Sequence, residues 1–119
     1  MNVAVIGASD KAERFSYQAV MLLKEKGHTV YPVHQRLQSI EGIKVYPGIK
    51  DVPAAVDTIS MYVAADISSS IADDILSKHP RRIIFNPGAE NRDLQTKAEA
   101  KGIVCLEACT LVMLRAHQF

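Results

Sequence analysis

The sequence predicts an α/β fold: a single doubly wound parallel sheet of five or six strands flanked by helices, forming one domain over residues 1–119. Three observations support this fold class. Short segments with strand character alternate along the chain with segments of helical character. The first strand segment, residues 2–6, is a continuous apolar run, which is typical of a strand buried on both faces of a sheet. The length of 119 residues suits one domain with its own core.

The N-terminal part of the chain reads as a strand, a helix and a second strand. The first strand ends at Gly7, and a polar stretch follows it. Ser16 is a suitable N-cap for a helix with apolar residues on one side. Gly27 suits the left-handed position that follows the last turn of such a helix. Residues 28–33 form the second predicted strand, which completes a βαβ unit.

The middle of the chain contains the clearest strand of the sequence. A loop with a short edge strand at 44–46 comes first, and residues 50–53 suit one helical turn. Residues 56–63 then form a central strand. Odd-numbered residues from Ile59 face one side of the sheet and even-numbered residues from Thr58 face the other.

The C-terminal half continues the alternation. Asp66 or Ser68 is predicted to cap a helix that Pro80 ends. The remaining predicted elements are, in order, a strand at 83–85, a helix capped by Asn91 and ended by Gly102, a strand at 103–106 and a short terminal helix at 110–117.

Composition and charge disfavour several classes of partner. Fourteen Lys and Arg residues against thirteen Asp and Glu residues leave a formal charge of +1, which argues against nucleic acid or an anionic membrane. The longest apolar stretch, 103–114, is interrupted by Glu107, and a membrane span needs about 20 apolar residues. The start of the chain does not read as a signal peptide, and two cysteines are too few for a disulfide framework. We therefore expect a cytoplasmic protein with reduced thiols.

The loop after the first predicted strand carries groups that suit a phosphate. Ligands of open parallel sheets bind outside the carboxyl ends of the strands, near the point where the strand order reverses. Gly7 allows a tight turn and a close approach to a ligand, and the next helix would direct free N–H groups toward the loop. Hydroxyl groups and positive charges come from Ser9, Ser16, Lys11 and Arg14. A phosphate site is favoured over an ordinary βα turn, which usually needs only about 2–6 residues.

This loop lacks the dinucleotide fingerprint G-x-G-x-x-G. Gly7 is the only glycine of the pattern, and the second strand ends in Val33-His-Gln-Arg36 with no carboxylate for a ribose. NAD is therefore disfavoured. Arg36 could receive the 2′-phosphate of NADP or equally the 3′-phosphate of coenzyme A, and the pattern does not separate these two ligands.

Several short motifs follow one another along nearly the whole chain. They are Val5-Ile-Gly-Ala-Ser9, Arg14-Phe-Ser16, Gly27-His-Thr-Val-Tyr-Pro-Val33, Ile40-Glu-Gly42, Tyr46, Asn86-Pro-Gly-Ala-Glu90 and Cys109. In this order and spacing they resemble the small stand-alone CoA-binding domain family. That family is similar to the nucleotide-binding domain of the succinyl-CoA synthetase α subunit.

The resemblance implies a Rossmann-like fold that binds CoA through three loops, and it implies no catalytic residue. Carried over by position, the loops comprise Gly7, Ala8 and Ser9 with Ser16, then Val33 and His34, and then Pro87, Gly88, Ala89 and Glu90. The family usually has Pro-Val-Asn-Pro after the second strand, where this chain has Pro32-Val33-His34-Gln35. An Asn–Pro pair would fix this loop, and its loss affects the adenine-side contacts, although Arg36 keeps a cation available.

The main functional hypothesis is a binding module for CoA or an acyl-CoA that catalyses nothing by itself. Amides of Gly7, Ala8 and Ser9 would reach the pyrophosphate. A cation from Lys11, Arg14 or Arg36 would neutralise phosphate. The adenine or pantetheine would be flanked by Val63, Ala64 and the loop of Pro87, Gly88 and Ala89.

Two alternatives remain open at this point. One is an enzyme, either an NADP-dependent oxidoreductase or a CoA-linked ligase fragment, although 119 residues leave almost no second lobe for a substrate. The other is a nucleotide-binding regulatory subunit. Apolar residues 111–114 could then dock a larger enzyme partner or a second copy, or they could belong to the core.

The remaining chemistry-bearing residues have simpler interpretations. His34 is the histidine that lies on a predicted ligand loop, and no two histidines have metal-ligand spacing on one element. Cys105 suits packing in the last strand as a small apolar residue. Cys109 follows that strand near the expected ligand face, and its structural role is favoured over a reactive one because a reactive thiolate needs a nearby cation, which the neighbouring sequence does not guarantee.

Overall fold

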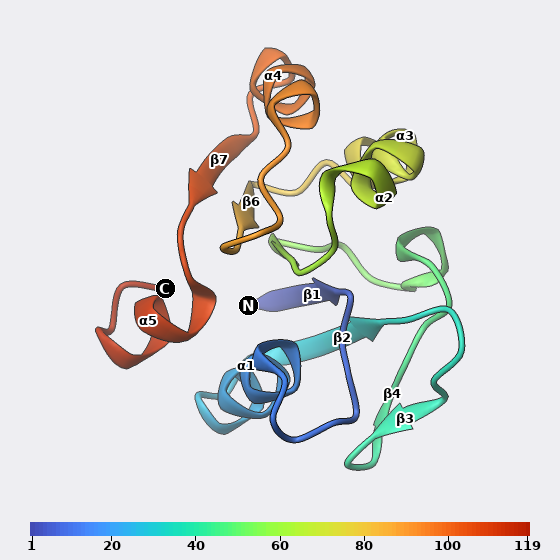
Figure 1. The fold of residues 1–119 in the computed structure, drawn as a ribbon, viewed down its shortest axis with the longest axis vertical. Coiled ribbons are helices and arrows are strands. Elements are labelled where there is room, and N and C mark those ends of the chain that lie inside the picture. Colours follow the sequence, from blue (N-terminus) through green and yellow to red (C-terminus); the bar gives the residue numbers. More distant parts are fainter.

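A five-stranded sheet forms the centre of the computed structural model, which describes residues 1–119 (Figure 1). All neighbouring strands are parallel, and their order in space is β2-β1-β5-β6-β7. The strands are β1 (Asn2–Ile6), β2 (Thr29–Val33), β5 (Thr58–Met61), β6 (Arg82–Phe85) and β7 (Val104–Glu107). Ala4 of β1 pairs with Tyr31 of β2 on one side and with Ile59 of β5 on the other, so β1 lies between these two strands. The chain thus adds β2 on one side of β1 and all later strands on the other, and the strand order reverses between β1 and β5. The predicted α/β Rossmann-like fold is confirmed.

Helices cover both faces of this sheet (Figure 1). They are α1 (Phe15–Glu25), α2 (Ala65–Ser70), α3 (Ala72–Ser77), α4 (Arg92–Ala100) and α5 (Thr110–Arg115), together with the short 3-10 helix η1 (Ile49–Asp51). On one face, Leu23 of α1 and Leu114 of α5 pack against Val3 and Val5. On the other face, helices α3 and α4 and η1 pack against the side chains of β5 and β6. Each face therefore has its own apolar core.

The central strand alternates as predicted. Ile59 and Met61 belong to the core under α3 and α4, with Val63 packed against it. Tyr62 packs against the core under α1 and α5. β5 is shorter than the predicted strand at 56–63, and Tyr62 and Val63 continue its alternation in the segment that follows Met61. This part of the chain therefore contributes to both cores.

Several predicted helix ends are confirmed and others are wrong. Gly27 and Gly102 adopt positive φ values of 90° and 81°, and the Asn91 side chain caps α4 by accepting from the Leu94 amide. Ser16 does not cap α1, because the helix already begins at Phe15 with Arg14 as its N-cap. The Arg14 carbonyl accepts a hydrogen bond from the Gln18 amide. Neither Asp66 nor Ser68 caps the next helix, whose N-cap is Ala64 with no side-chain bond.

Two further elements differ from their predicted form. The helix expected before Pro80 is divided at Ile71 (φ −116°, ψ 16°) into α2 and α3. The expected edge strand at 44–46 is instead a small antiparallel hairpin of β3 (Ser39–Ile40) and β4 (Ile43–Lys44). Tyr46 then forms an isolated parallel bridge to Val33, which holds the hairpin beside the main sheet.

The C-terminal helix belongs mostly to the core. Leu111 and Leu114 are buried, which excludes them from a docking face, whereas Val112 is 59% exposed. The longest helix, α1, has 11 residues, and no helix is long and apolar enough to cross a membrane.

Candidate functional site

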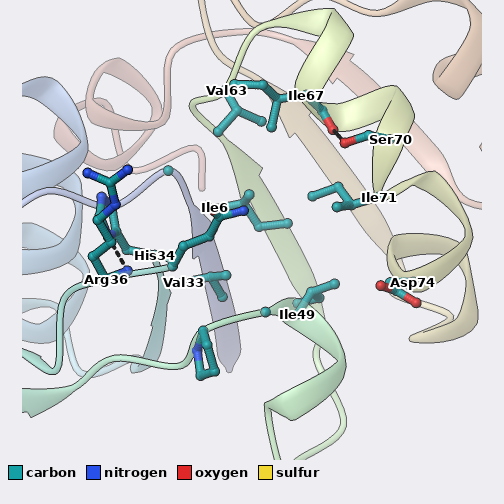
Figure 2. Close-up of a pocket in the computed structure, with 14 residues that line it drawn as sticks. Ile6, Val33, His34, Arg36, Ile49, Val63, Ile67, Ser70, Ile71 and Asp74 are labelled. Atoms are coloured by element: carbon teal, nitrogen blue, oxygen red, sulfur yellow. Dashed lines mark hydrogen bonds between the residues drawn. The ribbon is translucent and has the colours of Figure 1, made fainter.

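A cavity of about 530 Å³ opens at the carboxyl ends of β1, β2 and β5 (Figure 2). Its floor comprises the strand ends at Ile6, Gly7 and Val33. One side is the segment after β2, and the other side is formed by Val63 with helices α2 and α3. The cavity lies where the strand order reverses, which is the usual ligand site of an open parallel sheet. Its volume is in the range of about 300–1,000 Å³ that is typical of small-molecule sites.

Gly7 is required by the close approach of two strand ends. Its φ is +86°, and a Cβ at this position would lie 2.8 Å from Val63 Cγ1 and 3.0 Å from the Tyr62 carbonyl group. The amides of Gly7 and Ala8 both donate to the Val33 carbonyl, at 3.1 and 3.2 Å. Of the amides predicted to reach a pyrophosphate, these two are therefore occupied within the protein, and that of Ser9 is unbonded.

His34 fixes the loop after β2. Its Nδ1 accepts hydrogen bonds from the amides of Arg36 and Leu37, at 3.0 and 3.1 Å. This arrangement assigns the proton of the neutral ring to Nε2. Asn side chains fix turns by accepting from amides two and three residues further on, so the imidazole here performs the role of an Asn oxygen. The backbone of His34 also donates to the Tyr46 carbonyl at 3.0 Å.

The cavity has apolar walls and opposite polar ends. Ile49 and Ile71 form apolar walls beside the floor of Ile6 and Val33. Arg36 lies at one end and Asp74 at the other in Figure 2. Arg36 is exposed and has no ion pair, since the ion pair of this structure joins Arg81 to Asp57. Its guanidinium group is therefore available to an anionic ligand.

The structure brings only part of the predicted site together. Of the predicted site residues, those that line the cavity are Gly7, Val33, His34, Arg36 and Val63. Those outside its lining are Ala8, Ser9, Lys11, Arg14, Ser16, Ala64, Pro87, Gly88, Ala89 and Glu90.

The first loop lies beside the cavity and carries its own free donors. Lys11 and Arg14 are exposed, and the Ser9 hydroxyl accepts from the Lys11 amide at 3.1 Å. The first-turn amides of α1, those of residues 15–17, have no hydrogen-bond partner. Ser16 is buried under this turn. The loop therefore presents amides and cations to solvent.

The loop after β6 is held by its own side chains. The Gly88 amide donates to Glu90 Oε1 at 3.0 Å, and Gly88 has a φ of +90°. Asn86 and Ala89 are buried. The Asn86 side chain donates to Ser60 Oγ and accepts from the Thr110 amide, so it joins β5, β6 and α5. In this structure the Glu90 carboxylate stabilises the loop itself.

Sequence reasoning missed the wall that the segment after β4 and helices α2 and α3 contribute. These residues are Pro47, Gly48, Ile49, Ile67, Ser70, Ile71 and Asp74. In a continuous helix, the four-residue spacing of Ile67 from Ile71 and of Ser70 from Asp74 would place each pair on one face, but here the chain breaks at Ile71 between α2 and α3. That spacing indicates a common face but does not indicate which cavity the face borders.

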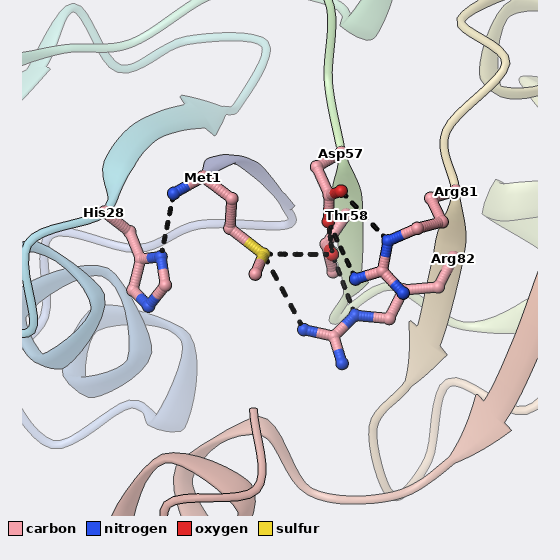
Figure 3. A network of polar contacts seen from close by, with 6 residues as sticks. All are labelled: Met1, His28, Asp57, Thr58, Arg81 and Arg82. Atoms are coloured by element: carbon pink, nitrogen blue, oxygen red, sulfur yellow. Dashed lines mark hydrogen bonds and ion pairs between the residues drawn. The ribbon is translucent and has the colours of Figure 1, made fainter.

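A second polar cluster lies at the amino ends of the strands (Figure 3). Arg81 donates two hydrogen bonds to the Asp57 carboxylate, at 3.0 and 3.2 Å, which lowers the pKa of Asp57. Arg82 is buried; its Nε donates to Thr58 Oγ1 at 2.8 Å and its guanidinium lies 4.3 Å from the Phe119 ring. These contacts fasten β5 to β6 and to the C-terminal residue, so this cluster stabilises the fold.

Comparison with known proteins shows the family and the fold of this chain. The chain matches the family described as the CoA binding domain over residues 1–115. A crystal structure of an uncharacterized protein superposes with a TM-score of 0.93 at 35% identity and covers 99% of this chain and 97% of that one.

Two similar proteins are larger enzymes. The α subunit of acetate–CoA ligase (ADP-forming) II from Pyrococcus furiosus is 41% identical over 56 residues, which are 46% of this chain and 12% of that subunit. The dinucleotide-forming acetyl-coenzyme A synthetase 1 of Ca. Korarchaeum cryptofilum, solved with phosphate and ADP, has a TM-score of 0.76 at 25% identity and covers 90% of this chain and 25% of that one. The chain thus spans a small part of each of these enzymes. With its family match over residues 1–115 and its cavity at the point where the strand order reverses, the chain belongs to the CoA binding domain family.

Proposed function

We propose that this protein binds CoA or an acyl-CoA in the cavity at the carboxyl ends of β1, β2 and β5. The observation that carries the proposal is the cavity itself, which combines apolar walls with the unpaired cation of Arg36 in a member of the CoA binding domain family. The Gly7 backbone forms part of the floor, where a side chain would collide with Val63. These features suit a nucleoside with a phosphate at its rim.

In this proposal the adenosine part of CoA occupies the cavity between Val33, Val63 and Ile71. Arg36 contacts the 3′-phosphate, because charge-assisted hydrogen bonds to phosphate are the stronger ones. The pyrophosphate lies toward the Ser9 amide and the unbonded first-turn amides of α1, with Lys11 and Arg14 nearby in the chain. The pantetheine arm then extends out of the cavity, toward the loop of Pro87 and Gly88.

We further propose that the domain holds the ligand and that a partner supplies any chemistry. The synthetase that resembles this chain contains the matching region as 25% of its length. This share leaves most of that enzyme for other domains. A larger enzyme or a second copy of this chain is the partner that the proposal requires.

Isothermal titration calorimetry with CoA, acetyl-CoA, NADP and NAD tests the proposal. We expect saturable binding of CoA and acetyl-CoA with a raised melting temperature, because a ligand that binds the native state stabilises it by mass action. NAD should not bind, since the end of β2 has no carboxylate for the ribose. Binding of NADP without binding of CoA would overturn the proposal in favour of an NADP site at Arg36.

A further inference from the structure

The Asp74 carboxylate has no partner within the protein. It lies in the first turn of α3, is partly buried and lines the cavity. The ion pair of the structure is elsewhere, between Arg81 and Asp57. The Ser77 hydroxyl donates to the backbone carbonyl of Asp74 at 2.8 Å, and no side chain or amide donates to its carboxylate oxygens. This carboxylate lines the cavity with its acceptor sites free, so a donor from a ligand in the cavity could form a hydrogen bond to it.

The break between α2 and α3 brings a second acceptor to the same end of the cavity. Ser70 precedes the break at Ile71, and both residues line the cavity with Asp74 (Figure 2). The Ser70 hydroxyl donates its hydrogen to the Ile67 carbonyl at 2.6 Å, so its oxygen faces the cavity only as an acceptor. This end of the cavity therefore offers acceptors and no side-chain donor.

The opposite end has the reverse character, because Arg36 is a donor with a positive charge. Apolar side chains, among them Ile6 and Ile49, lie between the two ends. A ligand that satisfies this arrangement has an anionic group, a flat apolar body and a hydrogen-bond donor at its far edge.

We propose that Asp74 recognises the exocyclic amine of the adenine base and so contributes to the choice of ligand. This inference rests on the proposed binding of CoA, whose adenine ring would lie between the apolar walls with its amine directed to the α3 side. The carboxylate accepts a hydrogen bond from the amine, and the Arg36 end receives the phosphate. Asp74 thus acts on the base and Arg36 on the phosphate.

The experiment compares CoA with 1,N6-etheno-CoA, in which the added ring removes both hydrogens of the amine. Calorimetric titrations are made with the wild-type protein, with Asp74→Ala and with Asp73→Ala. Asp73 is the matched control, because it adjoins Asp74 in the first turn of α3 but is exposed and does not line the cavity. Thermal melting followed by circular dichroism shows that each variant is folded.

We expect Asp74→Ala to weaken CoA binding about tenfold and to leave etheno-CoA binding unchanged within about twofold, since one hydrogen bond to a charged acceptor is lost only in the first case. Asp73→Ala should behave as the wild type with both ligands. Equal losses for the two ligands in Asp74→Ala, or no loss for either, would overturn the role of Asp74 while the CoA site itself stands. Absence of CoA binding by the wild-type protein would overturn both proposals.

Discussion

Replacing His34 with Ala tests how the loop after β2 is held. The change removes the acceptor for two amides, those of Arg36 and Leu37, and leaves the rest of the backbone unchanged. A hydrogen bond contributes about 1 kcal/mol net, and the exposed Arg36 amide can bond to water instead. We therefore expect a loss of about 1 to 2 kcal/mol in the free energy of unfolding. For a domain of this size that loss lowers Tm by roughly 3 to 8 °C.

His34→Asn separates the hydrogen-bonding role from the shape of the ring. An Asn oxygen can accept from the same two amides, so this variant should keep the free energy of unfolding within about 0.5 kcal/mol of the wild type. Urea denaturation followed by circular dichroism measures both variants, with the exposed neighbour Gln35→Ala as control. CoA titrations of the same proteins should show the weaker binding in His34→Ala. An Asn variant as unstable as the Ala variant, or an Ala variant as stable as the wild type, would refute this reasoning.

Three further predictions concern the cavity floor, its rim and the opposite end of the sheet. Gly7→Ala should lose about 2 to 4 kcal/mol of stability in urea denaturation, because the new Cβ meets Val63 Cγ1 at 2.8 Å and the backbone keeps a φ of +86°; a loss below about 1 kcal/mol would show that the strand ends separate easily. Arg36→Ala should weaken CoA binding about tenfold and Gln35→Ala less than about twofold by calorimetry, because only Arg36 carries a charge to the phosphate; equal affinities would reject this assignment. The Arg81 guanidinium lowers the pKa of Asp57 in the folded state. The ionised Asp57 therefore stabilises the fold at any pH above its pKa in the unfolded chain, and this stabilisation is lost as the pH falls through its pKa in the folded protein. The free energy of unfolding should therefore fall more between pH 6 and pH 2 in the wild type than in Asp57→Asn, and parallel pH profiles would contradict this.

The sheet could be predicted because its signals are local. Residues 2–6 are a mostly apolar run that ends at Gly7, and residues 58–63 alternate between polar or aromatic and apolar side chains. Gly27 and Gly102 mark helix ends where the chain takes a positive φ. Each of these signals depends on neighbours within a few residues. The parallel arrangement then follows from the alternation of strands with helices.

The candidate site could be predicted only where it follows directly from a strand end. Gly7 follows β1, Val33 ends β2, and His34 and Arg36 lie within three residues after it; all four line the cavity. Asp74 lies more than a helical turn from any strand, in α3 beyond the break at Ile71, and it lines the same cavity. That break has no proline or glycine to indicate it.

Helix caps also depend on contacts that the local sequence does not indicate. Ser16 and Ser68 are residue types that commonly cap helices, yet both are buried here, and the Ser68 oxygen accepts instead from Asn91 Nδ2 at 2.7 Å. A partner 23 positions away thus decided the role of this hydroxyl. Such competition between local and distant partners cannot be read from composition.

The shared carbonyl of Val33 links the first two ligand loops mechanically. Since the amides of Gly7 and Ala8 both depend on it, and since Val33 itself begins the turn that His34 closes, neither loop can open without loosening the other. We therefore expect the two segments to open together, so that the exchange of their amide hydrogens with deuterium rises or falls in both. A ligand that holds one of these two loops should therefore also reduce the motion of the other loop, without contacting it.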